Sequence, residues 1–243
     1  MYFSNMDWTH LLNLEFPQLS LDAADEAILK EFAHKLQDNY PYHSPDYAGQ
    51  MINPPLPLAQ AAHWMTSFVN PNNHALDGGR ATSALELETI QALGTMVGYS
   101  QPLGHLTSGG TTANLEALWV ARQCHAKTVV LANEHAHYTH SRMSEVLGMP
   151  FQAVASTENG SMDLIALETM LKELRSEGVN ATVVATLGTT GMGAVDALED
   201  IVPLAHTYDA RIHVDAAYGG YFTLADLPFN TLRHFNAMSS ANS

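Results

Sequence analysis

The sequence has 243 residues, of which 46% are hydrophobic and 14% are charged, a balance typical of packed globular domains rather than of disordered chains. Acidic residues outnumber basic ones by 25 to 10, and the formal net charge of -15 argues against nucleic acids and anionic membrane surfaces as partners. A single cysteine, no signal-peptide pattern at the start and no apolar run near the roughly 18–20 residues of a membrane span predict a soluble cytoplasmic protein.

The first third of the chain is predicted to be mostly helical. Residues 22–39 carry apolar side chains at helical spacing. Two loops rich in turn residues follow, at 40–45 and 70–79, and such loops are either functional or plain surface connections. We expect an N-terminal helical and loop segment over residues 1–80, and a second domain of different character over 81–243.

Helices and strands alternate from about residue 83 onward. Apolar periodicity predicts, in chain order, helix 83–97, helix 111–125, strand 128–131, helix 139–147, strand 151–155, helix 163–177, strand 182–187 and strand 211–215. Asp163 is predicted to cap the helix that it precedes, and Asp196 with Glu199 is predicted to form a capping box. The alternation predicts an α/β fold with a mostly parallel sheet flanked by helices.

Ligands of parallel α/β sheets bind at the carboxyl ends of the strands, and four polar clusters are expected there or at helix starts. The first is residues 107–114, with the sequence Thr-Ser-Gly-Gly-Thr-Thr-Ala-Asn. Two glycines allow a tight turn, and the following helix offers free N–H groups and hydroxyls to a phosphate. An ordinary helix cap of Ser and Gly explains this cluster equally well when it is taken alone.

The second cluster places His135, His137 and His140 just after the strand at 128–131. A His-x-His pair with a third histidine is typical of a metal site, whereas the flat ring of His137 could instead stack on an aromatic cofactor. Histidines on a plain loop or helix surface are the third alternative.

The third and fourth clusters follow apolar strands. Residues 186–193 form a turn rich in Gly and Thr whose glycine spacing is not that of a dinucleotide site. Asp215 ends the last strand, and Ala216 and Ala217 after it leave room for a flat ring. Because a buried carboxylate is costly without a partner, a protonated pyridine nitrogen or a metal ion is expected there; an Asp that caps a turn is the plainer alternative.

Together, the four clusters resemble those of the group II decarboxylases that depend on pyridoxal 5′-phosphate (PLP), the glutamate and aromatic amino-acid decarboxylase group. The resemblance covers the chain from about Tyr42 to its end. It rests on the order and spacing of Ser108-Gly109-Gly110-Thr111, His137, Gly188-Thr189-Thr190 and the segment from His213 to Tyr218. It implies an incomplete PLP-transferase type I large domain over 81–243, an amino-acid substrate and a homodimer in the full-length form.

The resemblance also implies a role for each matching residue. Gly110 and Thr111 would hold the cofactor's phosphate at the helix start. His137 and Ala217 would lie on the two faces of the pyridine ring. Asp215 would pair with the ring nitrogen and keep it protonated, because an adjacent negative charge favours the cationic form.

Thr190 would hydrogen-bond near the ring oxygen of the cofactor or the carboxylate of the substrate. With His137 and Asp215 it would form the catalytic set of a carboxy-lyase, which releases CO2 from an L-amino acid to give an amine. The protonated ring would serve as the electron sink for this reaction.

Members of the family form a Schiff base between PLP and a lysine. This lysine lies in an Asn/Asp-Pro-His-Lys segment, some way after the motif that corresponds to the segment from His213 to Tyr218. The lysines of this chain lack that context; they are Lys30, Lys35, Lys127 and Lys172. We therefore expect an N-terminal part of a decarboxylase, without normal turnover on its own and with weak PLP binding.

Two other classes of function stay open. A metal-dependent hydrolase could use His135, His137, His213 and Asp215, although it leaves the Ser-Gly-Gly-Thr turn and the two alanines unexplained. A non-catalytic pseudoenzyme fragment, or a partner for an intact homologue, would expose a large apolar surface. Among enzymes, aminotransferases and other lyases share this fold, but His137 and the Gly-Thr-Thr turn favour a decarboxylase.

Overall fold

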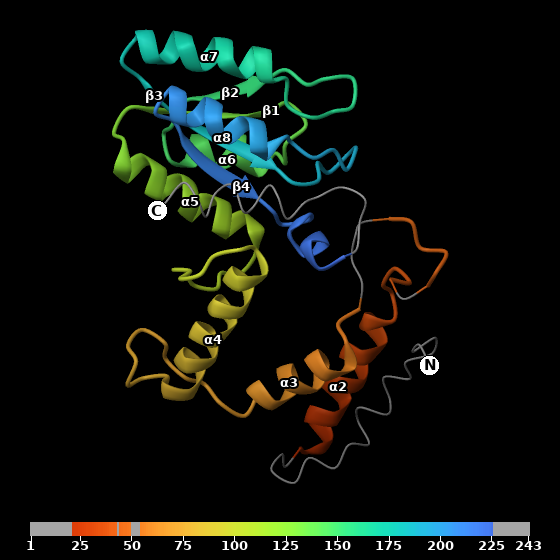
Figure 1. Cartoon of the computed structure of the whole chain (residues 1–243). Helices are drawn as coiled ribbons and strands as arrows, with labels where there is room; N and C mark the ends of the chain where they lie inside the picture. Colours follow the sequence, from red (N-terminus) through yellow and green to blue (C-terminus); the bar gives the residue numbers. More distant parts are fainter. Residues whose placement is uncertain (1–20, 43, 50–53, 226–243) are drawn as a thin grey trace. The chain divides into compact units, whose positions relative to one another are not determined.

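The computed structural model describes residues 21–42, 44–49 and 54–225, and Figure 1 labels its helices and strands. The chain divides into two compact units, residues 1–71 and residues 72–243. None of the helices that the structure describes combines the length and the apolar character needed to cross a membrane.

The first unit contains α2 (Ala23–Leu36) and α3 (Pro57–Thr66). The helix predicted over 22–39 is confirmed as α2, which begins with a capping box formed by Asp22 and Asp25. The sequence pattern did not indicate α3 as a separate helix; it begins at a proline whose fixed φ suits the first helical position. Neither helix buries a residue among those described.

The second unit follows the predicted alternation of helices and strands. Its elements are α4 (Arg80–Met96), α5 (Gly110–Cys124), β1 (Thr128–Asn133), α6 (Thr139–Val146), β2 (Phe151–Val154), α7 (Leu164–Ser176), β3 (Asn180–Thr186), α8 (Leu198–Thr207), β4 (Arg211–Asp215) and the short 3-10 helix η1 (Gly220–Leu224). The predicted cap of α7 is confirmed, because the Asp163 carboxylate accepts from the backbone N–H groups of Ile165 and Ala166.

The four strands form one sheet in the order β2-β1-β3-β4, and every neighbouring pair is parallel. This confirms the predicted α/β class. The register sets Thr186 of β3 beside Asp215 of β4. Because parallel strands end at the same edge of a sheet, Asn133 at the end of β1 belongs to this edge too.

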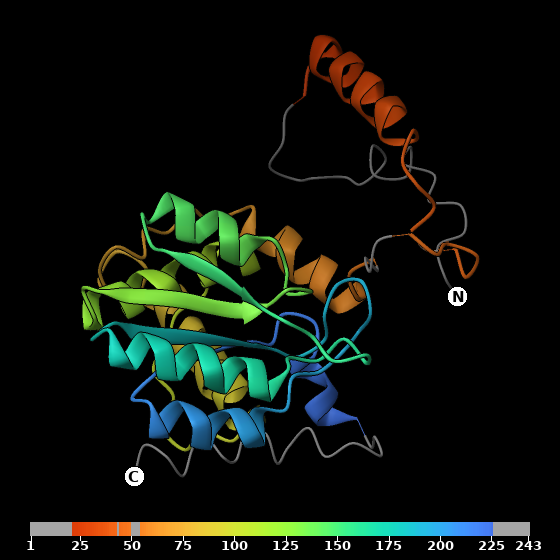
Figure 2. The same ribbon diagram turned by 90° about the horizontal axis from the view of Figure 1, so that it is seen from above.

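Helices cover both faces of the sheet, and the central strands β1 and β3 are buried, whereas the edge strands β2 and β4 are only partly buried. Figure 2 shows α7 and α8 on one side of the sheet and α6 on the other. Alternate residues of β1 separate accordingly: Leu131 joins the core cluster that contains Leu167 of α7 and Ile201 of α8. Val130 joins the cluster that contains Leu118 of α5 and Met143 of α6.

The capping box predicted for Asp196 and Glu199 is wrong. The residue that precedes α8 is Ala197, and no side chain caps this helix. Asp196 is instead fully buried, and its carboxylate accepts hydrogen bonds from other segments of the second unit.

Candidate active site

Asp215 lies at the carboxyl end of β4, where 8% of the residue is exposed. Its Oδ2 accepts hydrogen bonds from His140 Nε2 at 2.8 Å and from Asn114 Nδ2 at 3.2 Å. Its Oδ1 accepts from the backbone N–H of Ala217 at 3.1 Å. Burial alone raises the pKa of this carboxyl, but the hydrogen bonds from His140 and Ala217 and the nearby His140 and His213 lower the pKa to about 2. The carboxylate is therefore ionised at neutral pH.

Asn114 links this carboxylate to His213 of β4. The ring nitrogen Nε2 of His213 lies 2.7 Å from Asn114 Oδ1. Burial, and then the neighbouring His140, lower the pKa of His213 to about 4, so its ring is neutral at pH 7. Since an amide oxygen only accepts, His213 Nε2–H donates to Asn114, and Asn114 in turn donates to Asp215.

The start of α5 faces the loop that follows β4. A Cβ built on Gly110 would lie 3.7 Å from the Cβ of Ala217, an ordinary van der Waals contact. The turn into α5 needs a glycine at position 109, where φ is +146°. The structure thus brings Gly110, Ala217 and Asp215 together, although the two segments lie far apart in the sequence.

No side chain caps the N-terminus of α5. The hydroxyl of Ser108 lies 3.1 Å from that of Thr112 rather than on a backbone N–H group. Thr111, the second residue of the helix, is exposed. Ser108 therefore does not form the ordinary helix cap that was the plainer alternative for this cluster. The N–H groups of the first helical turn stay open to an anion.

The three histidines after β1 point in different directions. His140 is fully buried and bonded to Asp215, whereas His135 is exposed. His137 is partly buried; its Nδ1 hydrogen-bonds the Thr139 hydroxyl, and its ring lies 4.3 Å from that of Tyr138. The described residues contain no group of three side chains placed to share a metal ion, and the metal-dependent hydrolase finds no support.

The turn formed by Gly188, Thr189 and Thr190 makes no direct contact with Asp215 among the described hydrogen bonds. Gly188 has φ of +100°, and a Cβ there would lie 2.4 Å from Cδ1 of Tyr218, so this position requires glycine. Thr189 is buried and accepts from the backbone N–H of Ala194. Thr190 is exposed, and its hydroxyl has no hydrogen-bond partner among the described residues. The structure does not place it in contact with Asp215 or His137.

Asp196 fastens this turn to the ends of β1 and β3. Its Oδ1 accepts from Asn133 Nδ2 at 2.9 Å and from the backbone N–H of Met162 at 2.7 Å. Its Oδ2 accepts from the backbone N–H of Thr186 at 2.8 Å. Burial raises the pKa of Asp196 against the lowering effect of these bonds. The cluster fixes the edge of the sheet at which Asp215 lies.

No lysine of the second unit lies beside Asp215. Lys127 immediately precedes β1, at the opposite end of the strands from Asp215. Lys172 lies on the exposed side of α7. In the first unit, Lys30 and Lys35 of α2 form ion pairs along their own helix, with Glu26 and Glu31.

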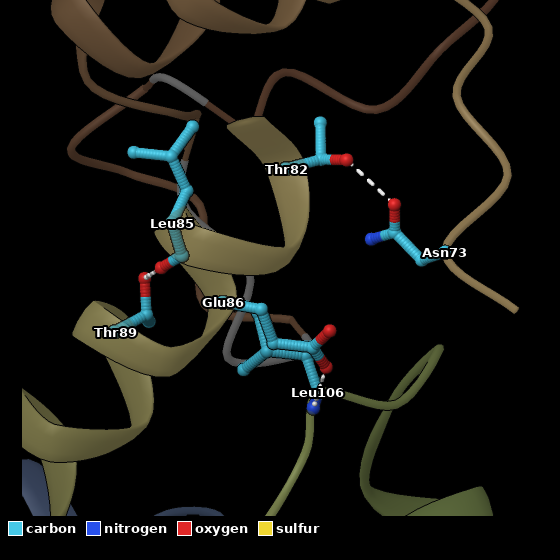
Figure 3. Close-up of a pocket in the computed structure, with 6 residues that line it drawn as sticks. All are labelled: Asn73, Thr82, Leu85, Glu86, Thr89 and Leu106. Carbon is cyan, nitrogen blue, oxygen red and sulfur yellow. Dashed lines mark hydrogen bonds between the residues drawn. The ribbon is translucent and has the colours of Figure 1, made fainter. Parts of the chain in front are cut away.

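An open hollow of about 520 Å³ lies over α4 and is drawn in Figure 3; it is lined by Asn73, Thr82, Leu85, Glu86, Thr89 and Leu106. Its polar groups bond one another: Thr82 to Asn73, Thr89 to the Leu85 carbonyl, and Glu86 to the Leu106 backbone N–H. None of the predicted site residues lines it, so we assign it no role in the site.

Two residues of the Asp215 environment could not be assigned to it from the sequence pattern. Asn114 was part of the first cluster but had no role assigned to it, and His140 was considered only as a metal ligand or an idle surface residue. A local signal exists for Asn114, a polar residue on a helix face whose other buried residues are Leu118 and Ala121. The buried face of α6 is mostly polar and gives no such signal for His140.

The chain is similar to known proteins of one family. A family model described as "Pyridoxal-dependent decarboxylase conserved domain" matches residues 9–242. The L-2,4-diaminobutyrate decarboxylase of Acinetobacter baumannii is 32% identical over 214 residues, which are 76% of this chain and 42% of that protein. A probable L-aspartate decarboxylase of Haloarcula marismortui is 35% identical over 183 residues, which are 74% of this chain and 48% of that protein.

Among solved structures, mouse CSAD in its apo form superposes with a TM-score of 0.82 at 24% sequence identity, covering 94% of this chain and 51% of that one. At this identity the likeness concerns the fold alone. The chain spans about half the length of the curated relatives that it matches.

Proposed function

The chain belongs to the pyridoxal-dependent decarboxylase family, and we propose on that basis that it forms part of an amino-acid decarboxylase whose PLP is held between the end of β4 and the start of α5. The relatives named above carry names with amino acids of opposite side-chain charge, L-aspartate and L-2,4-diaminobutyrate. The proposed substrate is therefore given as a class, an L-amino acid, and the product as the corresponding amine.

The observation that carries this proposal is the state of the Asp215 carboxylate. It is buried and ionised, and three N–H donors orient it. Among the described residues, Oδ1 accepts only from Ala217, and a carboxylate oxygen can accept two hydrogen bonds. A protonated pyridine nitrogen supplies both the missing donor and the compensating positive charge, so the residues present fit the ring of PLP.

The phosphate of PLP fits the start of α5. The helix presents uncapped N–H groups at Gly110 and Thr111, and the positive end of its dipole favours an anion. Gly110 also approaches the Cβ of Ala217, so the phosphate site and Asp215 would belong to one cradle. Gly110 and Thr111 are the proposed phosphate ligands.

The remaining site residues would act on the ring and the substrate. We assign His137 to one face of the pyridine ring and Ala217 to the other. Thr190, whose hydroxyl is exposed and free among the described residues, would donate to the cofactor's ring oxygen or to the carboxylate of the substrate. When bound, PLP supplies an electron-withdrawing ring that stabilises the negative charge left at the alpha carbon as CO2 departs.

Asp215 then has one defined task, which is to keep a proton on the ring nitrogen. A negative charge in direct contact stabilises the protonated form of its partner. The donors to Asp215 that the structure describes are His140, Asn114 and the Ala217 backbone, and they leave Oδ1 with room for one more N–H.

The proposed protein is a cytoplasmic homodimer without nucleic-acid or membrane partners. The net charge of -15 supports the absence of both partners. Large apolar side chains of the second unit are exposed, among them Leu103, Leu106 and Trp119, and a second copy of the chain would cover such a surface.

The test is binding of pyridoxamine 5′-phosphate, an amine that cannot react with lysines, to the full chain. We expect saturable binding that Asp215→Asn weakens by about tenfold or more, since the charge is lost and the shape is kept. Asp200→Asn, on the exposed side of α8, is the matched control and should leave the affinity unchanged. Equal affinities for the parent chain and Asp215→Asn would contradict the proposal.

A further inference from the structure

His140 is the one buried histidine of the second cluster, and the proposed function leaves it without a role. It lies in the first turn of α6, where Thr139, His140, Met143 and Ser144 form the buried face of the helix. His140 is 0% exposed. The ring lies 5.9 Å from that of His213, edge to face, so it is packed between α6 and β4.

The hydrogen atoms of this ring can be assigned from its partner. Asp215 Oδ2, which lies 2.8 Å from Nε2, belongs to a carboxylate that only accepts. Nε2 therefore carries a hydrogen atom and donates it. Nδ1 has no hydrogen-bond partner among the described residues, so Nε2–H is the one donor of this ring whose hydrogen bond the structure satisfies.

A histidine that merely filled the core would be expected to have both nitrogens satisfied, because a buried polar atom without a partner costs stability. His140 satisfies one nitrogen, and it does so on the carboxylate that the proposed function requires. The bond occupies Oδ2, together with the bond from Asn114. It leaves Oδ1 as the oxygen with room for a further donor.

We propose that His140 is a positioning residue for the cofactor's ring nitrogen: its Nε2–H holds Oδ2 of Asp215, so that Oδ1 stays ionised, oriented and open to the pyridinium N–H. This inference rests on the proposed function. It concerns the hydrogen bond from His140 to Asp215, and His140 itself does not touch the cofactor. His140 acts through Asp215, one hydrogen bond away from the ring nitrogen.

The test separates the ring-nitrogen contact from general binding by using two ligands. Pyridoxamine 5′-phosphate and its 1-deaza analogue, in which a C–H replaces the ring nitrogen, are titrated against the full chain. The ratio of their dissociation constants measures how much the nitrogen contributes. Gln can place a side-chain N–H donor near the position of His140 Nε2, whereas Leu has a similar size and no donor.

We expect His140→Leu to reduce the preference for the pyridine compound by about tenfold, as fits the loss of one hydrogen bond to a charged group. His140→Gln should keep the preference within about threefold of the parent chain. His206→Leu, on the exposed side of α8, is the control and should leave the ratio unchanged. A second donor-free variant, His140→Met, covers the case in which the Leu variant does not fold, as judged by its thermal melt.

Each result has a defined meaning. If His140→Leu weakens both ligands by the same factor and leaves the ratio unchanged, His140 is only structural and the inference is wrong, while the proposed function stands. If the parent chain binds neither ligand, or binds both equally, the proposed function fails and the inference fails with it. A lost preference in the Leu variant that Gln restores supports both.

Discussion

The side chain of Asn114 joins His213 to Asp215: it accepts from His213 at 2.7 Å and donates to Asp215 Oδ2 at 3.2 Å. One amide of α5 thus satisfies a partly buried and a buried group of β4. Since both of its contacts are made with the end and middle of the same strand, Asn114 also fixes how α5 meets the sheet.

Replacing Asn114 by Ala should destabilise the chain by about 2–3 kcal/mol. The substitution leaves the His213 N–H without an acceptor and removes one donor from a buried carboxylate, and each loss costs about 1–3 kcal/mol. Urea unfolding at pH 7 measures the change. Asn159→Ala, at an exposed turn, is the matched control and should stay within about 0.5 kcal/mol of the parent. Equal stability of the two variants would show that the Asn114 link does not hold the site together.

The stability of the chain should fall between about pH 6.5 and pH 4 because of His213. The unfolded chain takes up a proton on this residue near pH 6.5, whereas the folded state keeps the ring neutral down to about pH 4. Between these values the unfolded state binds more protons, so stability decreases as the pH falls, by about 3 kcal/mol in total.

The variant His213→Gln isolates this effect, because it keeps an N–H donor for Asn114 and loses the titrating ring. The measurement is the free energy of unfolding in urea at pH 7 and at pH 4.5. We expect the parent chain to lose more stability over this interval than the variant does. Parallel losses in the two proteins would contradict the assigned pKa shift.

Gly188→Ala should disturb the turn after β3. The position has φ of +100°, and the added Cβ would lie 2.4 Å from Cδ1 of Tyr218, so both backbone strain and a clash oppose it. We expect a loss of about 1–3 kcal/mol. Gly191→Ala lies in the same turn, with open space around its Cβ, and should be close to neutral. Thermal melts of the two variants test this difference. Similar losses of stability in both would show that position 188 has no special need for glycine.

Asp196→Asn should cost about 2–4 kcal/mol, although it changes neither size nor shape. Both carboxylate oxygens accept from N–H groups, so the amide NH2 of the variant must face at least one donor inside the core. Urea unfolding tests this, with Asp200→Asn as the exposed control. An unchanged midpoint for Asp196→Asn would mean that the cluster relaxes at little cost.

The sequence predicted the parts of the site that depend on local pattern. The segment that ends in Asp215 predicts a strand with a carboxylate at its end, and the structure has β4 there with Asp215 buried. The glycines before α5 predict a tight turn. Gly109 has a positive φ, as such a turn requires. These features depend on a few neighbouring residues, which a sequence displays directly.

The rest depends on how distant segments meet. Whether His140 points to solvent or to Asp215 depends on the rotation of α6 against the sheet, and no local pattern fixes that rotation. Asp196 illustrates the same limit: its spacing to Glu199 fits a capping box, yet three N–H donors from other segments compete for its carboxylate and win. The helix α8 begins without a side-chain cap as a result.

A crystal structure of the chain with pyridoxamine 5′-phosphate bound tests the central claim most directly. The account predicts the phosphate on the backbone N–H groups of Gly110 and Thr111, and the ring nitrogen within hydrogen-bond distance, about 2.7–3.0 Å, of Asp215 Oδ1. A ligand bound elsewhere, or one whose ring nitrogen faces away from Asp215, would contradict it.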